Sequence, residues 1–133
     1  MLLHTVVDAR RPRALAEFYR ELLGLGYRPG DEPPADGVDD ADWLVLVDAT
    51  GKRALAFQLA EELVTTTWPA PDVPMQLHLD FTVTSKAELT RQRARATALG
   101  AVVLMDRSDD EDEDEPLFVF TDPEGHPFCI FLA

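Results

Sequence analysis

Two histidines, an aspartate and the single cysteine are the side chains in this chain that are best suited to bind a metal or to take part in catalysis. His4 and His78 lie 74 residues apart, and Asp80 follows His78 by two positions. Imidazole and carboxylate groups ligate divalent cations, and a His–Asp contact also orients an imidazole as a general base. The spacing is therefore compatible with either a metal site or a proton-transfer site.

Each of these residues also has a structural interpretation. His4 and His78 could instead be structural residues with hydrogen-bond partners, or could only contact a ligand. A histidine with a perturbed pKa is often, but not always, catalytic. An acidic side chain within an apolar strand is costly unless it has a partner, so Asp80 is expected to contact a ligand or a histidine. Cys129 is expected to be a small buried hydrophobe, since no helix N-terminus or basic neighbour would lower its pKa.

Strand alternation indicates which side chains share a face. Successive side chains of a strand point to opposite faces. In the segment 76–83, the apolar residues Leu77, Leu79, Phe81 and Val83 form one face, which should pack on a helix. His78, Asp80 and Thr82 then point the other way, as His4 and Val6 do in the segment 2–7. That second face is the predicted ligand-facing side.

The elements that would position these residues occur twice. His4-Thr-Val-Val-Asp8 has its counterpart in His78-Leu-Asp-Phe-Thr82, and Asp48-Ala-Thr-Gly51 in Asp122-Pro-Glu-Gly125, both at an offset of 74 residues. Two copies of this length indicate a duplicated module rather than a solenoid. We expect one domain over residues 1–133, with module one at about 1–60, a linker at about 61–75 and module two at about 76–133.

Each module is predicted as a strand, a helix and then further strands. Hydrophobic periodicity, proline, glycine and N-cap signals give the boundaries. In module one they predict a strand at 2–7, a helix at 12–23, a loop at 30–42 and strands at 43–47 and 53–59. In module two they predict a strand at 76–83, a helix at 86–99 that is capped by Ser85, and strands at 101–105, 117–121 and 127–132.

Composition limits the partners. Of 133 residues, 46% are hydrophobic, and 25 acidic against 12 basic residues give a net charge of −13, which would repel nucleic acid and anionic membranes. We expect no nucleic-acid or membrane partner, and a cytoplasmic location because no signal peptide is evident. The acidic run 109–115 is expected to be a solvated loop, with attraction of cationic ligands as the alternative.

The chain resembles the glyoxalase/bleomycin-resistance/extradiol-dioxygenase superfamily, also called the vicinal oxygen chelate fold. The resemblance covers nearly the whole chain and is carried by several short segments in order. They are Val7-Asp8, Ala14-Leu-Ala-Glu-Phe-Tyr19, Leu22-Leu-Gly-Leu25, Ala56-Phe-Gln58, His78-Leu-Asp-Phe81 and Asp122-Pro-Glu-Gly-His-Pro-Phe-Cys129. It implies an α+β fold of two βαβββ modules whose curved mixed sheets surround a cup-shaped pocket.

The resemblance also implies where a divalent metal would bind. Metal-binding relatives use His, Glu or Gln from the first and last strands of each module, which points here to His4, His78 and Gln58. The last-strand position of module two holds Cys129 where relatives usually have Glu, and its equivalent in module one is Leu55 if that strand has no bulge. Aligning Val7-Asp8 with Val83-Thr84 instead pairs His4 with Asp80, so the first-module ligand stays open.

Three functions are consistent with these residues. The first is a glyoxalase-like small-molecule binding protein without the usual full metal site and with no cofactor, whose acidic balance suits a cationic or amphipathic ligand. The alternative is a divalent-metal-dependent lyase, isomerase or dioxygenase, and whether the chain is an enzyme stays open. The third is a dimeric interaction module; the resemblance implies a homodimer in any case. The predicted ligand-binding residues are His4, Trp43, Phe57, Gln58, His78, Asp80, Phe120 and Cys129.

Overall fold

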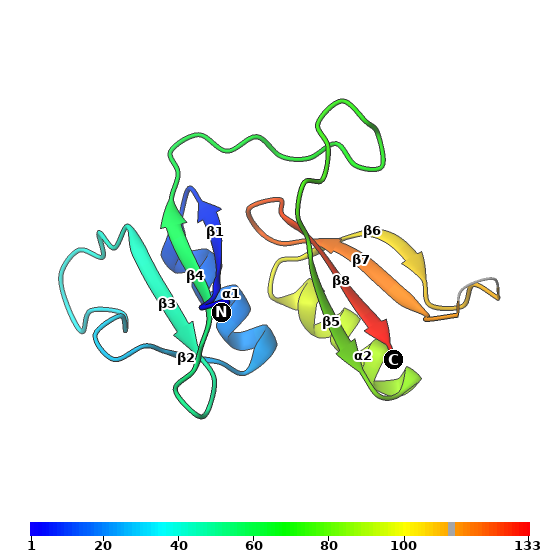
Figure 1. Ribbon diagram of the computed structural model, residues 1–133, viewed down its shortest axis with the longest axis horizontal. Helices are drawn as coiled ribbons and strands as arrows, with labels where there is room; N and C mark the ends of the chain where they lie inside the picture. The colour runs from blue at the N-terminus through cyan, green and yellow to red at the C-terminus, as the bar shows by residue number, and fades with distance from the viewer. Residues whose placement is uncertain (112–113) are drawn as a thin grey trace. The chain divides into compact units, whose positions relative to one another are not determined.

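The computed structural model describes residues 1–111 and 114–133, which fall into two compact units, Met1–Leu63 and Val64–Ala133. Each unit is an α+β module with one helix and a four-stranded mixed sheet that is curved but not closed. Figure 1 shows the strands and the helix of each unit. The predicted fold class of two βαβββ modules is therefore confirmed.

The first unit contains β1 (Thr5–Ala9), α1 (Pro12–Leu23), β2 (Gly26–Tyr27), β3 (Trp43–Val47) and β4 (Arg53–Leu59). Its sheet has the strand order β1-β4-β3-β2, in which β1 runs parallel to β4 and the other pairs are antiparallel. Pro12 opens α1, where its missing N–H costs nothing. Gly24 ends the helix in the left-handed region at φ 67°, which glycine adopts without strain.

The second unit repeats this order with β5 (Leu79–Val83), α2 (Lys86–Ala98), β6 (Val102–Arg107), β7 (Leu117–Thr121) and β8 (Pro127–Leu132). Its strand order is β5-β8-β7-β6, and β5 runs parallel to β8. The Ser85 hydroxyl accepts a 3.1 Å hydrogen bond from the Glu88 N–H, so the predicted N-cap is confirmed.

The structure supports an offset of 74 residues between the modules. Thr5–Ala9 and Leu79–Val83 start and end at equivalent positions, and so do the first residues of α1 and α2. The turns before β4 and β8 are each organised by an aspartate of their own. Asp48 Oδ1 accepts hydrogen bonds from two backbone N–H groups, and Asp122 Oδ1 does the same. His4 and His78 therefore hold the same place, directly before the first strand of each unit.

Aromatic side chains fill the space between each helix and its sheet. In the first unit Tyr19 of α1 stacks on Phe57 of β4, with ring centroids 5.8 Å apart. In the second unit Phe120 stacks on Phe128 at 4.9 Å, and Arg93 of α2 lies over Phe118. The core of each unit therefore lies between its helix and the helix-facing side of its sheet. Candidate site residues have to be sought on the opposite face of each sheet.

Several predicted boundaries were wrong. The first strands start later, at Thr5 and Leu79, and the strand after α2 runs on to Arg107. The short strand β2 (Gly26–Tyr27) was not predicted, because two residues are too few to show the alternation of a strand. Part of the acidic run, residues 112–113, lies outside the described residues, so the loop prediction there is untested.

No helix in the described parts of the chain is both long and apolar enough to cross a bilayer.

Candidate functional site

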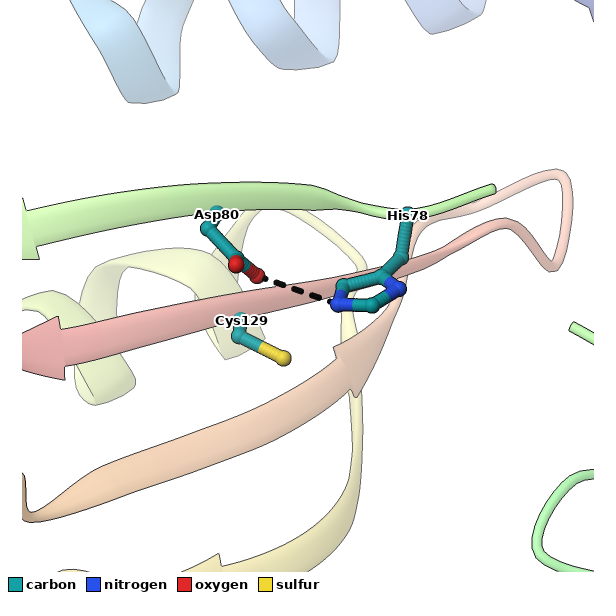
Figure 2. Close-up of side chains that lie close together, drawn as sticks. All are labelled: His78, Asp80 and Cys129. Atoms are coloured by element: carbon teal, nitrogen blue, oxygen red, sulfur yellow. Dashed lines mark ion pairs between the residues drawn. The ribbon is translucent and has the colours of Figure 1, made fainter. Parts of the chain in front are cut away.

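A histidine, an aspartate and a cysteine converge on one face of the second sheet. Asp80 of β5 and Cys129 of β8 are direct partners in the parallel β5–β8 register, so their side chains point to the same side. His78 lies two residues before Asp80 and therefore joins that face. One ligand atom from each of the three residues lies within 4.8 Å of the others. Figure 2 shows the three side chains close together.

His78 and Asp80 form the solvent-facing part of this cluster. Their Nε2 and Oδ1 atoms are 3.3 Å apart, and the two side chains are 40% and 53% exposed. Such an exposed pair adds little to stability, about 0.2–1 kcal/mol at most. Its importance is therefore chemical, because it leaves a carboxylate and an imidazole within reach of a ligand from solvent.

Cys129 forms the buried part of the cluster and is only 5% exposed. Burial raises the pKa of the Cys129 thiol to about 12, and the charge and hydrogen-bonding of the Asp80 carboxylate act in the same direction. At neutral pH the sulfur is thus a protonated thiol that lies beside the Asp80 carboxylate. The expectation that Cys129 is buried is confirmed.

The floor around Cys129 is apolar. Leu117 and Val119 of β7 form a buried cluster with Cys129, and three half-buried side chains pack against it: Trp68, Met105 and Phe131. The polar group of Asp80 therefore borders an apolar surface that includes two aromatic rings, those of Trp68 and Phe131. This combination of an apolar floor and a few polar groups is typical of small-molecule sites.

Trp68 is held over this floor by a compact segment before β5. The Thr67 hydroxyl accepts a 2.8 Å hydrogen bond from the Val73 N–H, and the Thr66 hydroxyl donates to the Val73 carbonyl at 2.8 Å. At the other side of the segment, Thr65 packs so closely on Gly125 that any Cβ there would lie 2.7 Å from Thr65 Cγ2. These contacts fix the segment on its own unit.

In the first unit, His4, Trp43 and Gln58 share the face opposite α1. The His4 and Trp43 rings are 6.0 Å apart, and Trp43 pairs with Gln58 across β3 and β4. The His4 Nδ1 atom is buried and has no hydrogen-bond partner among the described residues. Since these residues belong to one unit and His78 to the other, their use in one metal site stays a prediction.

Phe57 and Phe120 were predicted to contact a ligand, but the structure places both in the cores. Each is 0% exposed and stacks on another core aromatic ring, Tyr19 for Phe57 and Phe128 for Phe120. Strand parity is the physical reason. Phe120 pairs with Phe128, and Val119 with Cys129, so Phe120 and Cys129 lie on opposite faces of the sheet.

Strand register corrects the equivalence between the modules. Asp80 pairs with Cys129 in the second unit, and the equivalent residue Val6 pairs with Ala56 in the first. Ala56, rather than Leu55 or Gln58, is therefore the counterpart of Cys129. The first unit retains only the histidine of the cluster, so within the described residues the three-ligand group exists in the second unit alone.

Both units have the same strand order, so the protein is a small two-module α+β protein. The chain matches the glyoxalase-like domain family over residues 4–131. The protein therefore belongs to the glyoxalase-like domain family, as the resemblance implied.

Solved structures show the same fold. A glyoxalase/bleomycin resistance protein/dioxygenase family enzyme from Burkholderia phytofirmans PsJN is 18% identical, with a TM-score of 0.71 and coverage of 98% of this chain and 96% of its own. The fosfomycin resistance protein FosX from Mesorhizobium loti is 14% identical, with a TM-score of 0.67 and coverage of 100% and 92%.

A mutant of FosX from Listeria monocytogenes, complexed with Mn(II) and 1S,2S-dihydroxypropylphosphonic acid, is 15% identical, with a TM-score of 0.69 and coverage of 100% and 90%. A search of curated proteins gives no match. At these identities the likeness establishes the fold alone.

The chemistry of the donor set decides which metals the cluster suits. Hard cations such as Mg²⁺ and Mn²⁺ prefer carboxylate, carbonyl and water oxygens, whereas a thiol, an imidazole and one carboxylate suit borderline cations such as Zn²⁺. His78, Asp80 and Cys129 thus fit a borderline cation and do not supply the oxygen-rich set of a hard one.

Proposed function

We propose that this protein is a small-molecule binding protein of the glyoxalase-like family, which binds a cationic, partly apolar ligand at the second unit. The observation that carries the proposal is the Asp80 carboxylate at the edge of an apolar sheet face. Asp80 supplies the charge, the Leu117–Val119–Cys129 floor takes the apolar body, and Trp68 adds an aromatic surface. Binding of this kind does not require the usual full metal site.

Charge and burial support this assignment. The carboxylate of Asp80 is 53% exposed and can reach a ligand, whereas the neighbouring Cys129 thiol is neutral at pH 7 because its pKa is about 12. An ammonium group placed beside Asp80 would gain a charge-assisted hydrogen bond, and an aromatic ring near Trp68 would gain contact area. The net charge of −13 favours the approach of cations over anions.

The proposal is tested with matched probes. 3-Phenylpropylamine and 3-phenylpropanol have the same apolar body and differ in one charge. Because the Asp80 side chain is half exposed, the ammonium is expected to bind only about two- to fivefold more tightly, as for an exposed ion pair. In Asp80→Asn this preference is expected to vanish while the alcohol binds as before. Equal binding of both probes to the native protein would contradict the proposal.

The second candidate is a divalent-metal-dependent lyase, isomerase or dioxygenase, which the convergence of His78, Asp80 and Cys129 favours. A bound metal would polarise substrate oxygens. In that case His78, Asp80 and Cys129 would hold the ion, and the Leu117–Val119 floor would exclude water from one side of the substrate. Elemental analysis of the purified protein and of a His4→Ala/His78→Ala variant tests this candidate, which requires a stoichiometric metal that the variant loses.

A further inference from the structure

We propose that the loop 66–73 is a mobile cap on the ligand site of the second unit, and that Trp68 covers the apolar floor of this site until the cap opens. The inference rests on the proposed function and adds the step that regulates access to the site. Without such a cover, the floor of Leu117, Val119 and Cys129 would be open to solvent.

The floor lies on the face of the sheet that α2 does not cover. Leu117 and Val119 alternate along β7 with Phe118, so they point to the opposite side from Phe118. Arg93 of α2 lies over the Phe118 ring, which marks the helix side of the sheet. Leu117 and Val119 are nevertheless only 8% and 4% exposed. Another group must therefore bury them from the side opposite α2.

Trp68 is the covering group that comes from outside the sheet. Three half-buried side chains pack on the floor, namely Trp68, Met105 and Phe131. Met105 pairs with Val119 across β6 and β7. Phe131 pairs with Leu117 across β7 and β8, so Met105 and Phe131 lie beside the floor as strand neighbours. Of the three, Trp68 is the one whose ring can lie across the floor.

The loop that carries Trp68 is closed by its own hydrogen bonds. The Thr67 N–H donates to the Val73 carbonyl at 3.0 Å, and the Val73 N–H donates to the Thr67 hydroxyl at 2.8 Å. The Trp68 N–H donates to the Thr66 hydroxyl at 3.1 Å. Among the described residues, every hydrogen bond of the segment 66–73 stays within it. The loop can therefore move as one body without breaking any of them, and compact closed loops of this kind frequently carry function.

Opening of the cap costs little besides the contact between Trp68 and the floor. Residues 69–72 and 76–78 are exposed, so neither the tip of the loop nor its connection to β5 is packed. Thr65 is held against Gly125 and gives a fixed point about which the loop can turn. A segment with few buried contacts opens far more often than the whole protein unfolds. Figure 1 shows this loop in green, between β4 and β5.

The cap sets the order of events at the site. While Trp68 lies on the floor, the apolar body of a ligand cannot reach Leu117 and Val119, so opening has to precede binding. The apparent affinity is then reduced by the fraction of molecules that are open. Once the ligand is bound, the indole ring can close on its aromatic group instead of on the floor. Asp80 is 53% exposed and stays accessible in both states.

Alkylation of Cys129 by iodoacetamide at neutral pH tests the cap without any ligand, because Cys129 belongs to the covered floor. Trp68→Ala should raise the alkylation rate at least about tenfold, since the floor loses its cover. Thr67→Val removes the hydroxyl that closes the loop and should raise the rate about two- to tenfold. Asp72→Ala changes an exposed position of the same loop and is the matched control, whose rate should equal that of the native protein.

Circular dichroism establishes that each variant is folded before its rate is compared. An equal rate in folded Trp68→Ala and in the native protein would overturn the inference, because the floor would then be buried without the indole ring. If Trp68→Ala does not fold, Thr67→Val decides in the same way, and a native rate in that variant would overturn the inference. An equal increase in Asp72→Ala and Thr67→Val would also contradict it.

The cap and the proposed function can fail separately. Faster alkylation of Trp68→Ala, together with equal binding of 3-phenylpropylamine and 3-phenylpropanol, would support the cap and reject the cationic ligand. An unchanged alkylation rate, together with an Asp80-dependent preference for 3-phenylpropylamine, would reject the cap and support the ligand site.

Discussion

Cys129 lies directly beside Asp80 in the parallel β5–β8 pair, although the two residues are far apart in sequence. This register places a neutral thiol and a carboxylate next to each other on the face that carries His78. The consequence is a polar corner, formed by His78, Asp80 and Cys129, beside the apolar surface of Leu117 and Val119. Each proposal for this protein depends on that corner.

The Cys129 thiol is expected to react slowly with iodoacetamide at pH 7.5. The thiolate is the reactive form, and both the pKa of about 12 and the 5% exposure of the residue suppress it. Mass spectrometry of the alkylated protein against time gives the rate. The same protein unfolded in urea serves as control and should react much faster, and equal rates in the two states would contradict the buried, protonated thiol.

Asp80→Asn is expected to increase this alkylation rate only modestly. The substitution removes the charge of Asp80, which is a smaller cause of the raised Cys129 pKa than burial is. A large increase would show instead that Asp80, rather than burial, controls the thiol.

Tyr27 is expected to make the first unit less stable at alkaline pH. Its hydroxyl donates a 2.7 Å hydrogen bond to Glu17, and burial raises the pKa of Tyr27 to about 12 from 10.0. Because the folded pKa is the higher one, this stabilisation is complete below pH 10 and is lost as the pH rises towards 12. Urea unfolding at pH 8, 10 and 11 measures the decline.

The variant Tyr27→Phe isolates this contribution. It should be less stable at pH 8 by about 0.5–1.5 kcal/mol, the usual net worth of one hydrogen bond, and should decline less steeply above pH 10. Cys129 contributes to the alkaline decline with the same sign in both proteins, so the difference belongs to Tyr27. A parallel decline in the two proteins would show that the folded state does not raise the Tyr27 pKa.

The two equivalent turn glycines are expected to differ in their tolerance of alanine. Gly51 and Gly125 both have positive φ, at 84° and 93°, so Ala at either position costs about 1–2 kcal/mol. A Cβ at Gly51 meets nothing within 4 Å, whereas one at Gly125 would lie 2.7 Å from Thr65 Cγ2. Gly125→Ala should therefore reduce the free energy of unfolding more than Gly51→Ala does.

A double variant identifies the cause of that difference. Thr65→Ala removes the two closest side-chain atoms and should recover part of the stability of Gly125→Ala, with thermal unfolding as the measurement. If Thr65→Ala gives no recovery, the contact between the segment around Thr65 and the turn is not what makes Gly125 necessary.

Regular periodicity made much of the fold predictable from sequence. The helix at 12–23 and the strands at 43–47, 53–59, 117–121 and 127–132 have the predicted bounds. Alternation in the segment around β5 also gave the correct face for Asp80, because Asp80 and Thr82 are exposed while Val83 is buried. Glycine, proline and Ser85 marked the ends of the helices for clear stereochemical reasons.

The pairing of Asp80 with Cys129 was not predictable in the same way. It depends on the register of two strands from distant parts of the chain, which no local pattern encodes. The face on which Phe120 lies could not be predicted, because four successive residues of β7 are buried. A strand that is buried on both faces shows no alternation of polar and apolar residues. Trp68 falls in the predicted linker, because its packing against Leu117, Val119 and Cys129 depends on tertiary contacts that no local pattern shows.

The most direct test of a ligand site on the second unit is an NMR titration with 3-phenylpropylamine. The expected chemical-shift changes concentrate at residues 78–80, at Cys129 and Val119, and at the Trp68 indole, and they saturate together. The equivalent first-unit residues His4, Val6 and Ala56 should change little. Changes that concentrate on these first-unit residues, or that scatter over both units without saturating, would contradict the assignment of the site to the second unit.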